Sequence, residues 1–217
     1  MRPFAPVHPG REFHFALGDP RRIDRSSASE FRIVVLLQRP IEFADLRRVH
    51  NLTVQRFPHE YLDEGLGAMG LFLHDPPKNA RYRSTPANAI TFASIGVDGI
   101  HFGSITDGDL IDPMSPVEIT IPMAFEAPNY IVGKTLYDFL CLGRRHGYSN
   151  LGNLHLNFEA TIEHYQNPPD DFYDERCSDI LQTMTDELSL ASWPDVRGHF
   201  LDLQSRLMPM LRMPANP

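Results

Sequence analysis

Hydrophobic and polar positions alternate most regularly between residues 88 and 140, and this stretch predicts the centre of the fold. Two short apolar runs flank Asp98 and Gly99, a dipeptide that favours the positive φ angles of a type I′ hairpin turn. A two-residue loop at this point predicts the pairs that face each other across the hairpin, which are Val97 with Ile100, Ile95 with Phe102, and Ala93 with Ser104.

The two faces of the predicted hairpin differ in character. One face carries large apolar side chains and should be buried in the core: Ile95, Val97, Ile100 and Phe102. The other carries small residues around a histidine: Ser94, Gly96, His101 and Gly103. The small residues indicate close packing of a helix or bulges at Gly96 and Gly103, or alternatively a recess for a ligand with His101 as its polar group. We favour close packing or bulges over a recess, because a single histidine is more often structural.

A third strand is predicted over residues 117–123, where Val117, Ile119, Ile121 and Met123 alternate with Glu118, Thr120 and Pro122. This alternation is typical of a strand with one buried face and one exposed face. Pro122 has no N–H group, so it favours a position at or near the edge of a sheet. Together with residues 89–95 and 100–105, this strand predicts an antiparallel sheet.

Helical spacing of apolar residues recurs along the chain. It predicts helices over residues 43–57, 130–146 and 154–165, and Gly147 suits the C-terminal cap of the second. After residue 168, two apolar stripes separated by Trp193-Pro194 predict two further helices, which we expect to pair as an antiparallel αα-hairpin.

These elements predict an α+β fold, in which an antiparallel β-sheet packs with helices and a C-terminal αα-hairpin follows. Residues 1–28 are rich in proline, arginine and serine and indicate an irregular N-terminal arm. An α+β core domain is expected over residues 29–167, beginning with a short strand at residues 31–37. Residues 168–217 then form the helical hairpin packed on this core. At 217 residues, the chain is long enough for one sizeable core.

The net charge of −8 argues against nucleic acid and against an anionic membrane surface as partners. The charge is uneven, because residues 1–56 carry ten arginines against six acids and residues 168–217 carry nine acids against four arginines. Two solvated faces are the favoured explanation. Cys141 and Cys177 have apolar neighbours and indicate core thiols in a reducing compartment. The chain has no apolar run of membrane length, so we expect a cytoplasmic protein.

Residues 65–70 match the dinucleotide-binding pattern G-x-G-x-x-G letter for letter. No strand pattern precedes them and no helix pattern follows, so a glycine-rich turn leading into a short strand is favoured. The sequence also lacks G-x-S-x-G, H-E-x-x-H and P-loop motifs, and it indicates no cofactor. These features favour a protein that is not an enzyme.

Two other polar patterns favour simple interpretations. Asp107, Asp109 and Asp112 depart from the spacing of a calcium loop and indicate a solvated turn. His155 and Glu159 lie four residues apart on the helix predicted over residues 154–165. They are expected to form a surface pair rather than a metal site, because no third ligand stands at a recognisable spacing.

Four segments together resemble one set of uncharacterised bacterial proteins: residues 61–67 (YLDEGLG), 85–88 (TPAN), 91–102 (TFASIGVDGIHF) and 116–123 (PVEITIPM). That set carries Phe-Ala-Ser-Thr-Gly-Gly-Asp-Gly-Val-His-Phe, then a Pro-Val strand and a Leu-x-x-Phe-Leu helix. The chain differs from it at Ile95 and Val97. More distantly, the layout is similar to the SUKH superfamily of bacterial immunity proteins and cell-wall-synthesis regulators. The resemblance implies an α+β fold and a binding role, and it identifies no catalytic residue.

We therefore expect a non-enzymatic protein-interaction protein of immunity-protein or regulatory type. Its partner would be another protein, such as a neighbouring gene product, bound through the open face of the sheet or through the acidic C-terminal helices. The alternative is a small-ligand-binding protein or enzyme that uses a recess around His101, with Ser94, Gly96, Gly103 and Asp98 as the other binding residues. No metal ligand is indicated, and the oligomeric state is left open.

Overall fold

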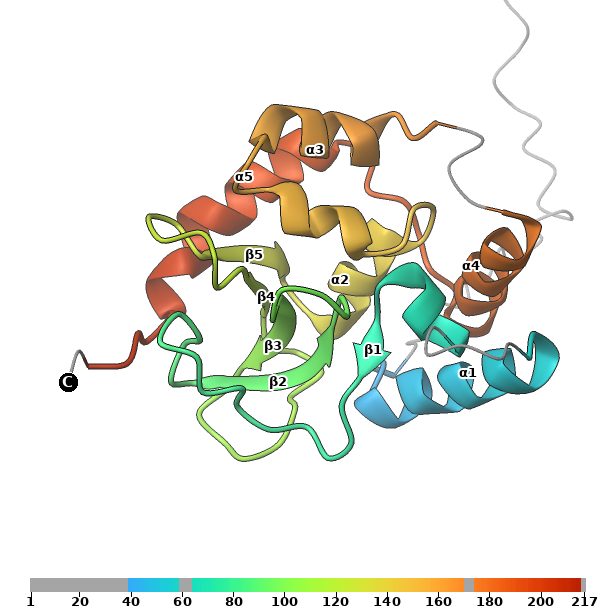
Figure 1. Ribbon diagram of the computed structural model, residues 1–217, viewed down its shortest axis with the longest axis horizontal. Helices are drawn as coiled ribbons and strands as arrows, with labels where there is room; N and C mark the ends of the chain where they lie inside the picture. Colours follow the sequence, from blue (N-terminus) through green and yellow to red (C-terminus); the bar gives the residue numbers. More distant parts are fainter. Residues whose placement is uncertain (1–38, 59–63, 170–173, 216–217) are drawn as a thin grey trace, which may run out of the picture. The chain divides into compact units, whose positions relative to one another are not determined.

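The computed structural model describes residues 39–58, 64–169 and 174–215, and these residues form one compact unit (Figure 1). The N-terminal arm predicted over residues 1–28 and the strand predicted over residues 31–37 lie outside the described residues.

Five antiparallel strands form one sheet in which each strand pairs with the next one along the chain. The strands are β1 (Phe72–Leu73), β2 (Ala89–Ser94), β3 (His101–Ile105), β4 (Val117–Thr120) and β5 (Asn129–Gly133). The predicted antiparallel sheet and the α+β class are confirmed. β1 is the short strand expected after the glycine-rich turn, and β5 was not expected.

Helices make up most of the remaining regular structure. They are α1 (Phe43–Arg56), α2 (Leu136–Gly143), α3 (Phe158–Gln166), α4 (Glu175–Leu188) and α5 (Val196–Leu207), with 3₁₀ turns η1 (Gly65–Met69), η2 (Ser149–Asn153) and η3 (Met208–Met210). Four helices begin at a polar residue whose side chain accepts a hydrogen bond from the backbone N–H three residues later; these residues are Thr135, Asn157, Asp174 and Asp195. Such N-caps fix where a helix starts, because the first N–H groups have no partner inside the helix.

The core lies between the sheet and α2, where aromatic rings meet. Phe139 of α2 contacts Phe92, Phe102 and Tyr148, with ring centroids 5.9, 4.9 and 4.7 Å apart. All four side chains are fully buried. Gly133 allows this approach, because a Cβ there would lie 2.5 Å from the Phe139 backbone nitrogen. The apolar face predicted for the hairpin is thus buried, with Val97 as the exception.

Residues 130–146 do not form the single helix that their spacing predicts. Residues 129–133 pair with β4 as strand β5, and the helix begins only after Thr135. The Asp138 side chain accepts a hydrogen bond from the Lys134 N–H at 2.8 Å, and the Thr135 hydroxyl accepts one from the Asp138 N–H at 3.1 Å. These two hydrogen bonds separate strand from helix.

The helix predicted from residue 154 begins later, at Phe158, where Asn157 caps it. His155 therefore lies before α3, with its Nδ1 2.9 Å from the Gly152 carbonyl oxygen. Glu159 is held instead by the Arg197 guanidinium of α5. The expected surface pair between His155 and Glu159 is wrong, because the two residues do not share a helix.

The two C-terminal helices are present, but they pack on different partners. α4 lies against α1 and η1, whereas α5 lies against β5 and α3 (Figure 1). Gln204 explains why α5 packs on β5. Its side chain accepts a hydrogen bond from the Ile131 N–H at 2.9 Å and donates one to the Ile131 carbonyl oxygen at 2.6 Å. α5 thus supplies hydrogen-bond partners to backbone groups of the edge strand β5. The antiparallel pairing expected between α4 and α5 is replaced by the packing of α4 on α1 and of α5 on β5.

Candidate binding site

The turn of the central hairpin forms where the sequence predicts it. Asp98 and Gly99 both have positive φ, at 53° and 68°, and the Ile100 N–H donates to the Val97 carbonyl oxygen at 3.0 Å. These are the features of a type I′ turn.

The pairing beyond this turn differs from the prediction. Gly96 adopts a φ of 87° and is looped out between Ile95 and the turn. Ile95 consequently bonds to Ile100 at 3.1 Å, and the observed strand pairs include Ser94 with His101 and Ala93 with Phe102. Val97, expected in the core, has 58% of its surface exposed. A further register shift lies between Thr91 and Ala93. The predicted register is wrong because Gly96 adds a residue to one strand, as in the bulge that its lack of a side chain also suggested.

The two glycines of the small-residue face make room for other side chains of the protein. A Cβ at Gly96 would lie 2.5 Å from the Phe72 ring, and one at Gly103 would lie 2.7 Å from Oε1 of Glu118. The space that suggested a recess at these positions is therefore occupied by Phe72 and by Glu118.

His101 is packed and hydrogen-bonded on both sides. Its Nδ1 lies 2.7 Å from the Gly99 carbonyl oxygen, and its Nε2 lies 3.0 Å from the Thr85 hydroxyl. Because a carbonyl oxygen only accepts, the proton belongs on Nδ1, and Nε2 accepts from Thr85. The Tyr82 ring stacks on the imidazole at 5.5 Å, and 2% of His101 is exposed. Burial lowers the pKa of His101, although the bond to Gly99 opposes this, so the neutral form is favoured.

Strand β4 is buried on both faces, which corrects the expectation of a half-exposed edge strand. It lies between β3 and β5, and it ends at Thr120, before Pro122. Glu118 and Thr120 are both fully buried. They share a layer with His101 and Asn129, because β3, β4 and β5 bring these positions to the same face of the sheet. We call Thr85, His101, Glu118, Thr120 and Asn129 the polar layer.

The hydrogen bonds of the polar layer determine the protonation of Glu118. The Thr120 hydroxyl oxygen lies 2.9 Å from Glu118 Oε2 and 2.8 Å from Asn129 Oδ1. A hydroxyl has one proton, so it cannot donate to both oxygens. The Asn129 amide is oriented by its Nδ2, which donates to the Ser84 carbonyl oxygen at 3.0 Å. Both contacts are satisfied when Glu118 is protonated, since the carboxyl group then donates to Thr120 and Thr120 donates to Asn129.

The electrostatics agree with a neutral Glu118. Burial raises the pKa of Glu118 from 4.5 to about 8, and the contact with Thr120 offsets only part of this rise. No cation reaches the carboxyl group among the described residues. Its Oε1 atom is buried without a hydrogen-bond partner in the described part of the chain. A buried acid of this kind is a candidate for proton chemistry or for recognition of a hydrogen-bond donor.

Two segments cover the polar layer, and we call residues 79–88 and 209–213 the cover. The Ala87 N–H donates to the Arg212 carbonyl oxygen at 2.6 Å. The Asn88 side chain accepts from the Arg212 N–H at 2.9 Å and donates to the Met210 carbonyl oxygen at 3.0 Å. Figure 1 shows the C-terminal segment beside the loop that precedes β2. The sheet consequently has no open face, because α2 covers one side and the cover the other.

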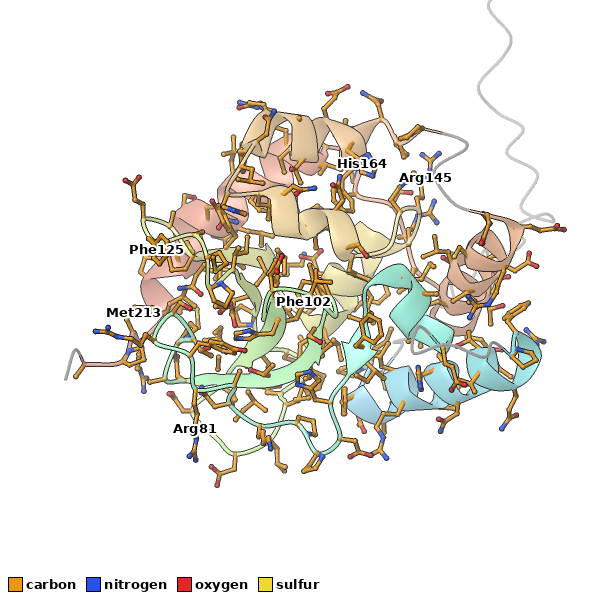
Figure 2. All side chains as sticks on the ribbon, viewed as in Figure 1. Arg81, Phe102, Phe125, Arg145, His164 and Met213 are labelled. Atoms are coloured by element: carbon orange, nitrogen blue, oxygen red, sulfur yellow. The ribbon has the colours of Figure 1, made fainter. Side chains whose placement is uncertain are left out.

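Large apolar side chains are exposed where the cover meets the turn between β4 and β5. Phe125 and Met123 in this turn have exposed fractions of 89% and 63%, and Met213 and Tyr82 of the neighbouring segments are also exposed. Asn129 ties the segments together, because its Nδ2 contacts both the Ser84 carbonyl oxygen and, at 3.6 Å, the Met213 sulfur. Figure 2 shows Phe125 and Met213 at the same end of the protein. We call Tyr82, Met123, Phe125 and Met213 the apolar rim.

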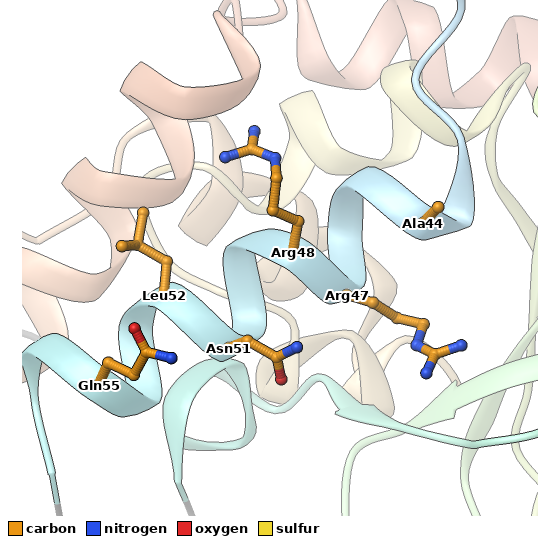
Figure 3. A pocket seen from close by; sticks show the side chains of 6 residues that line it. All are labelled: Ala44, Arg47, Arg48, Asn51, Leu52 and Gln55. Atoms are coloured by element: carbon orange, nitrogen blue, oxygen red, sulfur yellow. The ribbon is translucent and has the colours of Figure 1, made fainter.

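A hollow of about 500 Å³ lies along the outward face of α1 (Figure 3). The arginines at its margins are already paired, Arg47 with Asp75 at 2.7 Å and Arg48 with Glu187 at 2.8 Å. Both arginines are exposed. Paired surface charges of this kind do not by themselves indicate a site.

The aspartate-rich turn is a local hydrogen-bonding structure. Asp112 accepts hydrogen bonds from the Met114 N–H at 2.9 Å and from the Ser115 hydroxyl at 3.0 Å. Within residues 39–58, 64–169 and 174–215, no group of three or more potential metal ligands comes together.

Comparisons with protein-family models, with curated proteins and with solved structures found no match to this chain. The resemblance to the SUKH superfamily therefore stays a prediction. None of the described helices has the length and apolar character needed to cross a membrane.

The binding roles predicted for His101, Ser94, Gly96, Gly103 and Asp98 also stay predictions. Sequence reasoning missed Glu118, because a glutamate in an alternating strand indicates a solvated face. The one sign that Glu118 is buried is its position opposite Gly103, which leaves space for its side chain. That position can be recognised only when the register between β3 and β4 is known.

Proposed function

We propose that this protein is a non-enzymatic interaction protein that binds another protein through the apolar rim. The observation that carries the proposal is the exposure of Phe125 and Met123, which are 89% and 63% exposed on one turn. Contiguous apolar side chains on a surface are typical of interaction sites, and phenylalanine and methionine are enriched in them. Methionine also adapts to the shape of a partner, because its side chain is unbranched and flexible.

The residues beneath the apolar rim are held by hydrogen bonds and ring stacking, which favours a binding role for the rim over accidental exposure of its side chains. The turn of residues 121–128 joins two paired strands, and the Ile121 N–H donates to the Pro128 carbonyl oxygen at 2.7 Å. Tyr82 stacks on the buried His101 ring, and Met213 contacts Asn129. The exposed groups therefore project from a hydrogen-bonded base, which lowers the entropic cost of binding.

The sequence offered two other surfaces for a protein partner. The open face of the sheet is excluded by the cover and by α2. The acidic helices remain, and on α4 Glu187 is engaged by Arg48 while Asp186 accepts from Gln182 at 2.7 Å. The rim is favoured because it combines apolar groups from three segments, whereas Asp186 and Glu187 are already in contact with polar side chains of this chain.

Affinity capture with purified variants tests this proposal. The Phe125→Ser and Met123→Ser proteins should lose at least about tenfold in affinity for the captured protein, roughly the cost of removing a central apolar contact. Leu156→Ser is the matched control, because Leu156 is 73% exposed on the turn before α3. The proposal fails if the rim variants retain full binding, or if the control loses as much as they do.

A second candidate function is a small-ligand-binding or enzymatic role for the polar layer. The buried Oε1 of Glu118, which has no hydrogen-bond partner among the described residues, favours it specifically. A ligand with an N–H or O–H donor would satisfy this atom after displacement of the cover. A thermal-shift screen of small amines and alcohols tests it, with Glu118→Leu as the variant that should lose any stabilisation. Equal responses of the two proteins would contradict this role.

A further inference from the structure

A small cavity of about 40 Å³ lies at the C-terminal end of α2, remote in sequence from the rim and the polar layer. Its walls come from the last turn of α2 and the residues after it, from the end of α3, and from the segment that precedes α5. Arg144, Arg145 and His146 line it together, and no acidic residue is among its lining residues. Two guanidinium groups at one cavity, with no acidic residue in its lining, favour an anion.

The two arginines differ from most others in the described part of the chain. Arg39, Arg47, Arg48, Arg197, Arg206 and Arg212 each pair with a carboxylate. Arg144 and Arg145 make no ion pair within the described residues. Arg144 is partly buried, and its Nε is inaccessible and without a hydrogen-bond partner there. A buried guanidinium N–H without an acceptor is costly, so a ligand that supplied one would be favoured.

Helix capping does not explain these arginines. Basic residues often follow a helix because they interact with its last carbonyl groups. Here the Gly143 carbonyl oxygen accepts from the Gly147 N–H at 2.7 Å, and the Leu140 carbonyl oxygen accepts from the Tyr148 hydroxyl at 3.1 Å. The Arg144 guanidinium donates elsewhere, to the Leu190 carbonyl oxygen at 3.3 Å between α4 and α5.

We propose that this cavity binds a single oxyanion group, the phosphate or carboxylate of a small molecule, between Arg144 and Arg145. A guanidinium presents paired N–H donors that match such oxygens. Gln166 adds a donor, since its oxygen accepts from the Val196 N–H at 2.7 Å and its NH₂ group remains available. The Ser192 hydroxyl also lines the cavity.

The size of the cavity limits the ligand. About 40 Å³ is room for roughly three water molecules, since each needs about 10–15 Å³ by this measure. One phosphate or carboxylate group fits such a space, whereas a nucleotide would place only its terminal phosphate inside. The site goes beyond the proposed function, because neither the rim nor the polar layer contributes to it.

Trp193 provides a direct probe, because it lines the cavity and is the single tryptophan of the chain. Inorganic phosphate is titrated into the full-length protein at constant ionic strength, and tryptophan fluorescence is followed. A parallel titration uses acetate, so that the two arms distinguish phosphate from carboxylate recognition. We expect a saturable change in at least one arm.

Three variants locate the binding. Arg144→Gln and Arg145→Gln should weaken phosphate or acetate binding at least tenfold. Arg56→Gln removes an exposed arginine of α1 that makes no ion pair with any described residue, and it should leave binding unchanged. Arg145 is exposed, so its variant tests the site even if Arg144→Gln fails to fold. The proposal is overturned if wild type shows no saturable change in either arm, if chloride reproduces the change, or if the Arg145 variant binds like the Arg56 control.

Discussion

Glu118 is a buried residue that makes the stability of the fold depend on pH. Its carboxyl group lies in a layer where the Thr120 hydroxyl has a single proton for two neighbouring oxygens. Protonation of Glu118 resolves that conflict, and burial favours the same neutral state. Gly103 is part of this arrangement, because any Cβ there would lie 2.7 Å from the Glu118 oxygen. The residue thus depends on its strand neighbours for space and for hydrogen bonds.

The first prediction concerns the pH dependence of stability. The pKa of Glu118 is raised in the folded protein, from 4.5 to about 8, so the folded state holds one more proton than the unfolded state between these values. The contribution of Glu118 to the free energy of unfolding is therefore fully present below pH 4.5. It is lost as the pH rises toward about 8, and the loss amounts to a few kcal/mol at most. Glu118→Gln should flatten this part of the profile, as measured by urea unfolding at several pH values. An unchanged slope in the variant would contradict a neutral Glu118.

The second prediction concerns His101. Its replacement by alanine leaves the Gly99 carbonyl oxygen and the Thr85 hydroxyl without their partner and removes the ring under Tyr82. His101→Ala should therefore destabilise the protein by about 1–3 kcal/mol. The melting temperature is measured together with partner capture, because a binding role would instead leave stability intact and weaken capture. A variant that melts like wild type and keeps its partner would rule out both roles.

Among the elements, α2 decides how the sheet is buried. It is eight residues long, and seven of those residues are buried, so it acts as a core helix rather than a surface helix. The hydrogen bonds of Asp138 with the Lys134 N–H and with the Thr135 hydroxyl end β5 and start α2 within a few residues. Asp138 is held again at 2.9 Å by His199 of α5, which joins the start of α2 to the C-terminal part of the chain.

The third prediction concerns the packing of α2 on the sheet. Phe139 is fully buried and contacts three aromatic rings. Phe139→Ala should destabilise the protein by about 3–5 kcal/mol, because it removes a core aromatic side chain and leaves a cavity. Denaturant unfolding measures this loss, and Tyr137→Ala on the same helix is a partly buried comparison that should lose less. A loss below about 1 kcal/mol for Phe139→Ala would mean that this face is not buried.

At the scale of the whole molecule, segments that are far apart in sequence pack together and bury the polar layer. The cover joins residues 79–88 to residues 209–213 and seals the polar layer. Within the described residues, opposite charges from the two ends of the chain meet where Arg48 of α1 pairs with Glu187 of α4 at 2.8 Å. Exposed ion pairs contribute little to stability, so the packing of α1 against α4 carries more of that contact. The apolar rim lies above the sealed layer and is thereby held in place.

The sequence alone determined the features that depend on neighbouring residues in the chain. Asp98 and Gly99 predicted the turn correctly because positive φ angles are a local property of these residue types. Alternation located β2, β3 and β4, and helical spacing located α1 and the two C-terminal helices. These signals depend on backbone preference and on burial averaged over several residues.

Only the tertiary structure decided which groups meet. The looped-out Gly96 shifted the hairpin register, and pairing with β4 made residues 129–133 a strand instead of a helix. α4 and α5 separated because Gln204 satisfies the edge strand β5 while α4 packs on α1. Glu118 is buried because β5 and the cover enclose a face that its own strand would leave in water. Each outcome depends on a contact between residues distant in sequence, and local propensity carries no information about such contacts.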